Sequence, residues 1–315
     1  MEESMNKNNY INLHLHTDAS IGDSVIKVPD LIKQVEDYGQ KYIAITDHGT
    51  VANWYALQQE CKQSNVKPIF GNEFYCKPTL ERPQDRNRYH LVCLAMNDVG
   101  ATNIRKMQRL SVTDHFYYKP LLAHPILFEN TEGVFVSTAC ALSYICQNFE
   151  KGQDDIAYSF LNKLLDNFGK DNVAIELQYH PTWQNDKGLY PQNILNEKLI
   201  KLYEDTDCKW LINTFDSHVL TDEDRILRKK LQSIDWKKAE SEISDTLESN
   251  VLGNTELCYK FGRMSGVDDD IIQLCIDNTH KIAEKCCFEM PEYDRVIPKF
   301  DKHLDFEKIF LKKVV

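Results

Sequence analysis

Short runs of β-branched and aromatic residues alternate along the chain with longer stretches in which apolar residues recur every three or four positions. The short runs are typical of buried strands and the longer stretches of amphipathic helices, and their alternation favours an α/β fold with a mostly parallel sheet. Seven strands are predicted, over Tyr10–Leu15, Lys41–Thr46, Pro68–Cys76, His90–Met96, Val134–Thr138, Val173–Gln178 and Trp210–Thr214. We expect them to form a closed or nearly closed β/α barrel.

Helices are predicted between these strands and after the last of them. The ranges are Val28–Tyr38, Ala52–Ser64, Thr102–Leu110, Asp155–Phe168, Gln192–Glu204, Asp222–Ile234 and Asp268–Lys285. The strand pattern stops after residue 220, where the chain becomes polar and helical, with a charged stretch at Trp236–Ser249 and a short amphipathic tail at Phe306–Val315. We therefore predict a barrel domain over residues 1–235 and a helical extension over residues 236–315.

Composition narrows the class of protein. The 315 residues are 42% hydrophobic and 27% charged, which is typical of a globular chain with a full-sized core. A net charge of −11 argues against a protein that holds nucleic acid on a broad basic surface. The ten cysteines include no C-x-x-C pair and no long apolar run is present, so we expect free thiols, a cytoplasmic location and no zinc ribbon.

Potential metal ligands gather where the predicted strands end, which is where β/α barrels carry their active sites. Strand ends or the loops after them carry His14, His16, Asp23, His48, Glu73, Cys140, Asp216 and His218. Imidazole, carboxylate and thiolate groups bind zinc, manganese or iron. A single buried histidine more often has a packing role, but His14-x-His16 together with Asp216-x-His218 supplies two chelating pairs, and we interpret them as metal ligands.

His90 begins its predicted strand instead of ending it. If Pro68–Cys76 and His90–Met96 pair as an antiparallel hairpin, the start of the second strand lies beside the end of the first. His90 would then approach Glu73, and the barrel would not be fully parallel.

Several segments resemble one known family. They are NLHLHTDASIGDS (12–24), AITDHG (44–49), GNEFYC (71–76), HLVCLAMN (90–97), HFYYKP (115–120), STACALSYI (137–145), ELQYH (176–180) and NTFDSHVLTDEDR (213–225). The chain is similar to the polymerase and histidinol phosphatase (PHP) superfamily, and within it to the N-terminal PHP domain of bacterial DNA polymerase III alpha subunits. The likeness covers nearly the whole chain, although Leu121-Leu122-Ala123 and the residues around Cys140 depart from the family pattern.

The resemblance implies a distorted seven-stranded barrel with a C-terminal helical extension and up to three divalent metal ions, which could be zinc, manganese or iron. The ligands it implies are His14, His16, Asp23, His48, Glu73, His90, Cys140, Asp216 and His218. We assign catalytic roles to Glu73, Asp216 and His218, with Glu73 as a bridging carboxylate. Asp47 is expected to orient a ligand, Glu176 and His180 either contact substrate or complete their strand, and His115, His124, His280 and His303 are ordinary surface or core residues.

Three functions fit this set of residues. The first is a metal-dependent phosphoesterase that acts as a 3′→5′ exonuclease on DNA ends. The second is a structural module that supports a separate DNA polymerase III alpha chain or other replisome subunits, and the third is a small-molecule phosphatase resembling histidinol phosphatase. Positive residues that could hold a phosphate backbone occur at Arg82–Arg88, Arg105–Arg109 and Arg225–Lys230, although such runs are more often solvated surface.

Overall fold

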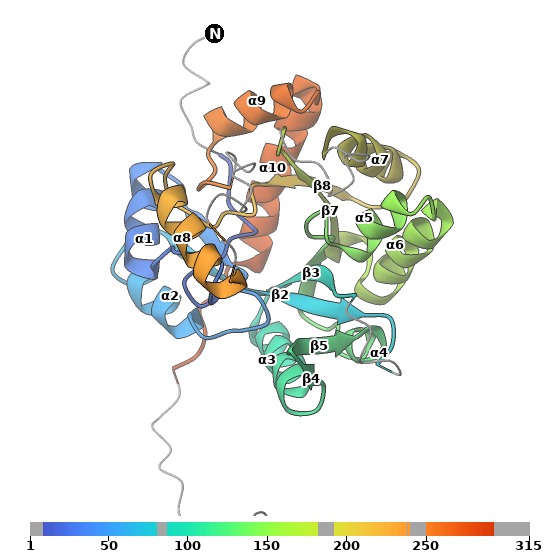
Figure 1. Ribbon diagram of the computed structural model, residues 1–315, viewed down its shortest axis with the longest axis horizontal. Helices are drawn as coiled ribbons and strands as arrows, with labels where there is room; N and C mark the ends of the chain where they lie inside the picture. Colours follow the sequence, from blue (N-terminus) through green and yellow to red (C-terminus); the bar gives the residue numbers. More distant parts are fainter. Residues whose placement is uncertain (1–8, 81–86, 182–191, 238, 240–249, 293–315) are drawn as a thin grey trace, which may run out of the picture.

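A curled sheet surrounded by helices forms the centre of the molecule in the computed structural model, which describes residues 9–80, 87–181, 192–237, 239 and 250–292 (Figure 1). The strands are β1 (Tyr42–Ile45), β2 (Lys67–Lys77), β3 (Tyr89–Ala95), β4 (Phe116–Tyr117), β5 (Lys119–Ala123), β6 (Val134–Ser137), β7 (Val173–Gln178) and β8 (Trp210–Thr214). Six of the seven predicted strands are confirmed to within one residue at each end. The short strands β4 and β5 were not predicted.

β2 is the longest strand and connects the two parts of the sheet. It pairs in parallel with β1 along its first half and with β5 at its end. Its other edge pairs antiparallel with β3, which places Tyr75 opposite His90. The order then continues from β3 through β6 and β7 to β8, and only β3 and β4 run against their neighbours. The predicted hairpin is therefore confirmed, and the barrel is not fully parallel.

The segment Tyr10–Leu15 is not a regular strand, so this prediction is wrong. The chain here lies between β1 and the end of β8: the Thr46 amide donates to the Leu15 carbonyl (2.8 Å) and the His16 amide to the Ser217 carbonyl (2.9 Å). The Leu15 amide donates to the Thr46 side chain at 3.0 Å instead of to a neighbouring backbone. Side-chain partners thus interrupt the ladder, yet the segment still links the two edges of the sheet.

Helices cover the outside of the sheet (Figure 1). They are α1 (Val28–Asp37), α2 (Trp54–Cys61), α3 (Asp98–Thr113), α4 (His124–Phe128), α5 (Tyr144–Glu150), α6 (Asp154–Phe168), α7 (Gln192–Glu204), α8 (Asp224–Trp236), α9 (Thr255–Met264) and α10 (Asp269–Cys286). The seven predicted helices are present, whereas α4, α5 and α9 were not predicted. Most of Trp236–Ser249 and all of Phe306–Val315 lie outside the described residues.

Apolar side chains fill one end of the barrel. Alternate residues of a strand point to the same side, and one buried cluster takes its members from these positions. They are Ile11, Leu13, Ala44, Ile69, Val92, Leu94, Phe135, Ala139, Ala174 and Ile212, joined by Ile282, Ala283 and Cys286 of α10. Further along the same alternating positions the residues become polar, with Glu73 after Ile69 on β2. The barrel therefore has an apolar end closed by α10 and a polar end opposite.

The C-terminal helices pack directly on the barrel. α10 lies beside β8, where the Asn278 side chain donates to the Leu211 carbonyl at 2.9 Å. Ile272, Cys275 and Ile276 of α10 also belong to the larger core cluster that joins the sheet to the outer helices. The boundary at residue 235 stays a prediction. In the described part of the chain, no helix combines the length and the apolar character that a membrane span requires.

Candidate metal centre

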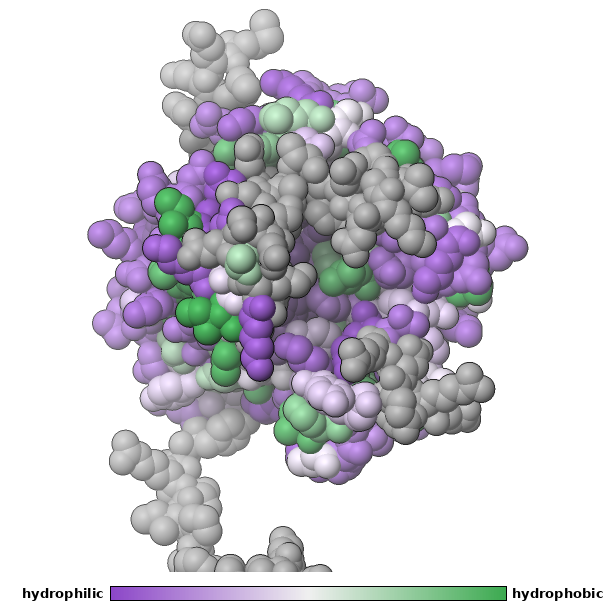
Figure 2. Space-filling view, in the orientation of Figure 1, coloured by the Kyte–Doolittle hydropathy of each residue, from purple (hydrophilic) through white to green (hydrophobic). Residues whose placement is uncertain are grey.

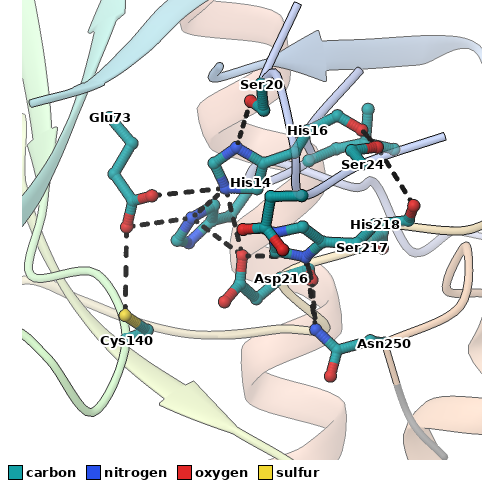
Figure 3. A network of polar contacts seen from close by, with 12 residues as sticks. His14, His16, Ser20, Ser24, Glu73, Cys140, Asp216, Ser217, His218 and Asn250 are labelled. Atoms are coloured by element: carbon teal, nitrogen blue, oxygen red, sulfur yellow. Dashed lines mark hydrogen bonds and ion pairs between the residues drawn. The ribbon is translucent and has the colours of Figure 1, made fainter. Parts of the chain in front are cut away.

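The polar end of the barrel brings together all nine side chains predicted as metal ligands. Each of them contacts at least one other member of the set, and together the contacts form one continuous network, part of which is drawn in Figure 3. The nine residues come from seven separate stretches of chain, so only the folded barrel can assemble them. Their assignment as ligands stays a prediction.

Glu73 lies at the middle of this network and is 1% exposed. One carboxylate oxygen is 3.0 Å from His90 Nδ1 and 3.3 Å from His14 Nε2. The other is 2.7 Å from His48 Nδ1 and 3.3 Å from His16 Nε2. A carboxylate with two oxygens facing different groups of imidazoles has the arrangement expected of a bridging ligand.

Asp216 faces the first histidine pair from β8. Its Oδ1 is 3.1 Å from His16 Nε2 and 3.3 Å from His14 Nε2. Its backbone is in the left-handed region, with φ 46°, and so is that of Ala139, φ 61°, directly before Cys140. Residues with a Cβ rarely adopt this conformation, and such strain collects at functional sites. The two turns aim Asp216 and Cys140 at the centre, with Cys140 Sγ 3.5 Å from His90 Nδ1.

A second carboxylate, Asp23, joins His48 to His218. Its Oδ2 is 3.3 Å from His48 Nε2 and 3.1 Å from His218 Nε2. Its Oδ1 accepts hydrogen bonds from Arg228 Nη2 (2.7 Å) and Gln232 Nε2 (2.9 Å), both on α8. The sequence analysis named Arg228 only within Arg225–Lys230, as a possible phosphate contact, and did not name Gln232, although polar residues four apart on a helix after the last ligand pair were a usable signal.

Three histidines have one ring nitrogen occupied by a partner outside the centre. His14 Nδ1 is 2.7 Å from Glu176, His16 Nδ1 is 3.0 Å from Ser20 Oγ, and His218 Nδ1 is 2.6 Å from the Asp216 carbonyl. A hydrogen bond at Nδ1 fixes the tautomer and the ring orientation, which leaves Nε2 available toward the centre. This is the usual arrangement of metal-binding histidines.

Asp47 supports His16 through Ser20. The Ser20 hydroxyl donates to Asp47 Oδ1 at 2.8 Å, and the Thr17 amide donates to the same oxygen at 2.7 Å. Because the Ser20 hydroxyl donates its hydrogen bond to Asp47, its oxygen accepts one from His16 Nδ1–H. These contacts are those expected of the positioning role predicted for Asp47.

Glu176 has a position that the sequence analysis did not foresee. It accepts from His14 Nδ1 and from the hydroxyls of Ser137 and Thr214, so it lies behind His14 and orients it. The two residues are 162 positions apart, and nothing local in the sequence indicates the contact. His180 is also buried, which lowers its pKa to about 4.

The residues of the centre fit a bound cation. His14 Nε2 and His16 Nε2 are 3.2 Å apart, and each ring has its Nδ1 proton directed elsewhere. Two lone pairs that face each other at this distance repel unless a proton or a metal ion lies between them. Buried atoms without a well-formed hydrogen bond, which are rare in proteins, occur here at His48 Nδ1, Glu73 Oε2 and Asp216 Oδ1.

Three overlapping triads of described residues have ligand atoms close enough to share an ion. They are His14, His16 and Glu73; His16, His48 and His218; and His48, Glu73 and His90. The atoms of each triad lie within 4.8 Å of one another. Two triads contain Glu73, so the same carboxylate could serve two neighbouring ions.

The carboxylates and imidazoles of the centre stabilise one another's charged forms. Burial alone would raise the pKa of Glu73, but the imidazoles of His90, His14 and His48 outweigh it and hold that pKa well below its usual range. Burial alone would lower the pKa of His48, but the carboxylates of Glu73 and Asp23 raise it to about 10. Burial, followed by the charge of Glu73, raises the pKa of the Cys140 thiol. The cluster therefore favours cations, whether protons or metal ions.

The remaining histidines lie outside this network. His124 is buried between Tyr144 and Phe160, with ring centroids 5.3 and 4.6 Å away. His280 on α10 is 3.8 Å from Glu284. His115 lies between α3 and β4, and His303 is outside the described residues. Among the described ones, the predicted ordinary roles agree with these positions.

Curated relatives of the chain are DNA polymerase III alpha subunits. The one from Aquifex aeolicus is 30% identical over 314 residues, and the match covers 93% of this chain and 26% of that protein. The one from Borreliella burgdorferi is 28% identical over 318 residues, covering 96% of this chain and 26% of that protein. The chain thus spans about a quarter of the length of these relatives.

Two further comparisons concern the fold. A two-domain protein from Bacteroides vulgatus that contains a predicted PHP-like metal-dependent phosphoesterase matches with a TM-score of 0.38 and 10% identity, over 81% of this chain and 69% of that one. The family model described as PHP domain matches residues 12–180, which contain seven of the nine predicted ligands and more than half of the sequence. The chain therefore belongs to the PHP domain family.

Proposed function

We propose that this chain is a metal-dependent phosphoesterase that binds up to three zinc, manganese or iron ions at the polar end of its barrel. The observation that carries the proposal is the pair of imidazole nitrogens, His14 Nε2 and His16 Nε2, that face each other at 3.2 Å beside Glu73 and Asp216. Packing alone does not account for this arrangement, because a buried pair of this kind needs a cation between its members.

The ligands proposed for these ions are His14, His16, Asp23, His48, Glu73, His90, Cys140, Asp216 and His218. Divalent ions in such a site polarise phosphoryl oxygens and lower the pKa of water toward neutrality. Glu73, whose two oxygens face different groups of histidines, would hold neighbouring ions together. Asp216 and His218 come from one short turn after β8, so they orient substrate and ions together at the opening of the barrel.

Other residues act by holding the ligands in place. Glu176 fixes the tautomer of His14, and Asp47 does the same for His16 through Ser20. Arg228 neutralises one oxygen of Asp23 and leaves the other directed at His48 and His218. The centre is thus preorganised, which spares the reaction the cost of arranging these groups.

The substrate that we propose is the 3′ end of a DNA strand, removed one nucleotide at a time by 3′→5′ exonuclease activity. Membership of the PHP family and the DNA polymerase III relatives support a role in DNA replication. The charge of −11 favours a short strand end over a long duplex, since most of the surface repels phosphate. A separate DNA polymerase III alpha chain or another replisome subunit is the partner that we propose for delivering this end.

The proposal is tested with the purified full chain. Bound metals are measured first, and then a 3′-labelled single strand and a generic phosphomonoester are incubated with added Mn²⁺ or Zn²⁺. We expect the strand to shorten from its 3′ end and expect a His14→Ala/His16→Ala double variant to lose both metal and cleavage. His280→Ala, on α10 and outside the centre, is the matched control and should behave as wild type.

Each other result has a definite meaning. If the wild type binds no metal, or if cleavage survives in the double variant, the phosphoesterase proposal is wrong. Metal binding without cleavage of either substrate identifies a structural module. Turnover of the phosphomonoester without shortening of the strand identifies a small-molecule phosphatase and removes the exonuclease proposal.

A further inference from the structure

A tight hairpin carries exposed aromatic rings next to the metal centre. It consists of β4 and β5, with Tyr117 paired to Lys119 and Tyr118 alone at the turn. Phe116 is 59% exposed and Tyr118 is 72% exposed, which is unusual for side chains of this size. Figure 2 shows apolar side chains reaching the surface at this tip of the molecule, over β4 and the end of α3.

The turn residue of the hairpin is strained. Tyr118 has φ 60°, in the left-handed region, where glycine or asparagine is the ordinary occupant. Its ring packs only edge-on against that of Tyr117, with centroids 4.8 Å apart. A large ring at such a position gains little for the fold, so its presence points to a use of the exposed ring itself.

The base of the hairpin rests against the metal centre. Gly49, which follows the ligand candidate His48, has no Cβ, and one would lie 2.6 Å from Pro120 Cγ of β5. Lys119 Nζ lies over the Tyr75 ring, 5.5 Å from its centroid. The Tyr75 ring in turn stacks on His48, with centroids 5.4 Å apart. A continuous row of side chains therefore runs from the exposed tip to the ligands.

Positive charge accompanies the aromatic rings. Lys119 is exposed beside Tyr118, and Arg88 Nη2 donates to the Tyr117 carbonyl at 2.9 Å, which fixes a guanidinium at the hairpin. These two side chains supply positive charge at the hairpin, although the protein as a whole has a net charge of −11. Aromatic rings for stacking bases, with cations for the phosphates between them, are the features by which proteins hold single-stranded nucleic acid.

We infer that the β4–β5 hairpin is a stacking platform for single-stranded nucleic acid, with Tyr118 and Phe116 as the base-contacting rings and Lys119 as a phosphate contact. A strand held there leads past Tyr75 to the metal ligands. This inference rests on the proposed function for the fate of the strand, but binding itself needs neither metal nor hydrolysis, so the two can fail separately.

Binding is measured by fluorescence anisotropy with the full chain in EDTA at low salt. The probes are a labelled thymidine oligomer of about 12 nucleotides, within the site sizes of single-strand-binding proteins, and an abasic strand of the same length and charge. We expect the thymidine strand to bind at least about tenfold more tightly than the abasic one, because stacking requires bases.

Variants at the turn distinguish the contribution of the Tyr118 ring to binding from that of the hairpin fold. Tyr118→Gly adopts φ 60° without strain, so the hairpin should keep its shape while affinity for the thymidine strand falls about tenfold. Tyr118→Phe keeps the ring and should restore affinity. Tyr55→Ala removes an equally exposed ring, 72%, from α2 and should change nothing. Lys119→Ala should weaken binding of both strands. It should also reduce the slope of the logarithm of the binding constant against the logarithm of salt concentration by about one.

Several outcomes would overturn the inference. These are the absence of measurable wild-type binding, equal binding of the abasic strand, or an unchanged affinity in Tyr118→Gly; the last would leave the hairpin as a contact for a protein partner. Turnover of a small phosphoester by wild type and Tyr118→Gly should be equal. If the wild type with added Mn²⁺ or Zn²⁺ neither shortens a strand nor turns over a small phosphoester, but binds the thymidine strand, the proposed function fails and the platform stands.

Discussion

Glu73 and Glu176 are both buried carboxylates in the barrel, but their neighbours differ. Glu73 faces four histidines at distances between 2.7 and 3.3 Å and has an oxygen without a well-formed hydrogen bond. Glu176 faces one histidine, two hydroxyls and the Gln178 amide, and each of its oxygens has a hydrogen-bond partner. The first arrangement suits a group that binds metal, and the second suits a group that holds a ligand in position.

Glu176→Gln is expected to weaken metal binding without removing a ligand. The neutral amide no longer holds the Nδ1 proton of His14 as a carboxylate does, and loss of such partners typically costs about 10- to 100-fold in metal affinity. Competition with a chelator of known affinity measures the change. Glu197→Gln, exposed on α7, makes the same chemical change away from the centre and should leave the affinity as it is. Equal affinities in the two variants would contradict the positioning role.

His124 should make stability depend on pH. Burial, with a smaller contribution from Lys163, lowers its pKa to about 4, whereas histidine in an unfolded chain has a pKa of about 6.5. Between these values the unfolded chain binds a proton that the folded chain does not. The free energy of unfolding therefore decreases as pH falls through this window, by about 2 kcal/mol between about pH 7.5 and about pH 5.

Urea denaturation of wild type and His124→Gln, both in EDTA, measures this contribution. EDTA keeps the metal content constant, and the titrating groups of the metal centre are the same in both proteins. Over that pH range the free energy of unfolding of the variant should decrease by about 2 kcal/mol less than that of wild type. An identical pH dependence in the two proteins would rule out a depressed pKa at His124.

Capping of the helices offers a test with an internal control. Asn97 begins α3, and its side chain accepts from the Gly100 amide at 3.0 Å. Gln153 occupies the same position at α6 but makes no such hydrogen bond. Asn97→Ala should lower the free energy of unfolding by about 1 kcal/mol, and Gln153→Ala should change it by at most a few tenths. Thermal or chemical denaturation compares the two, and equal losses would contradict a capping role for Asn97.

Among the elements, those with a strong hydrophobic period were predictable and those fixed by distant contacts were not. β7 and β8 match their predicted ranges because each begins with a run of three apolar residues, Val173–Ile175 and Trp210–Ile212, that is typical of a buried strand. Tyr10–Leu15 has the same pattern, but contacts such as the one between the Leu15 amide and the Thr46 side chain interrupt its ladder. α4 spans only His124–Phe128, too short for a helical period to show in the sequence.

The candidate site likewise contains contacts that the sequence could predict and contacts that it could not. The approach of His90 to Glu73 followed from the antiparallel pairing of two strands close in sequence, and their separation is 3.0 Å. The contacts of Arg228 with Asp23 and of Glu176 with His14 span 205 and 162 residues. Such pairs depend on the closure of the whole barrel, which a hydrophobic pattern cannot specify. Residue types thus indicated the chemistry, while the supporting contacts required the fold.

For the molecule as a whole, metal binding and proton binding should be coupled. Burial alone would lower the pKa of His48, but the carboxylates of Glu73 and Asp23 raise it to about 10, which favours a protonated His48 when no metal is bound. A metal ion that binds His48 must displace its proton. Zinc affinity should therefore fall as pH is lowered from about 8 to about 6, by about tenfold per pH unit for each proton displaced.

Calorimetric titration with zinc in two buffers that differ in ionisation enthalpy measures the protons released. The apparent binding enthalpies should differ in proportion to the number of protons. The His14→Ala/His16→Ala double variant should release fewer of them. If the enthalpy is the same in both buffers, the centre is already deprotonated, and the coupling does not exist.

α10 closes the apolar end of the barrel, and this limits the side from which a substrate could reach the centre. Ile282, Ala283 and Cys286 pack into the interior there, so the described residues fill the barrel at this end and leave the ligand side chains at the other. If the proposed exonuclease activity is correct, a DNA strand would reach the centre from the polar end alone, and the cleaved nucleotide would have to leave from that same end before the strand could advance.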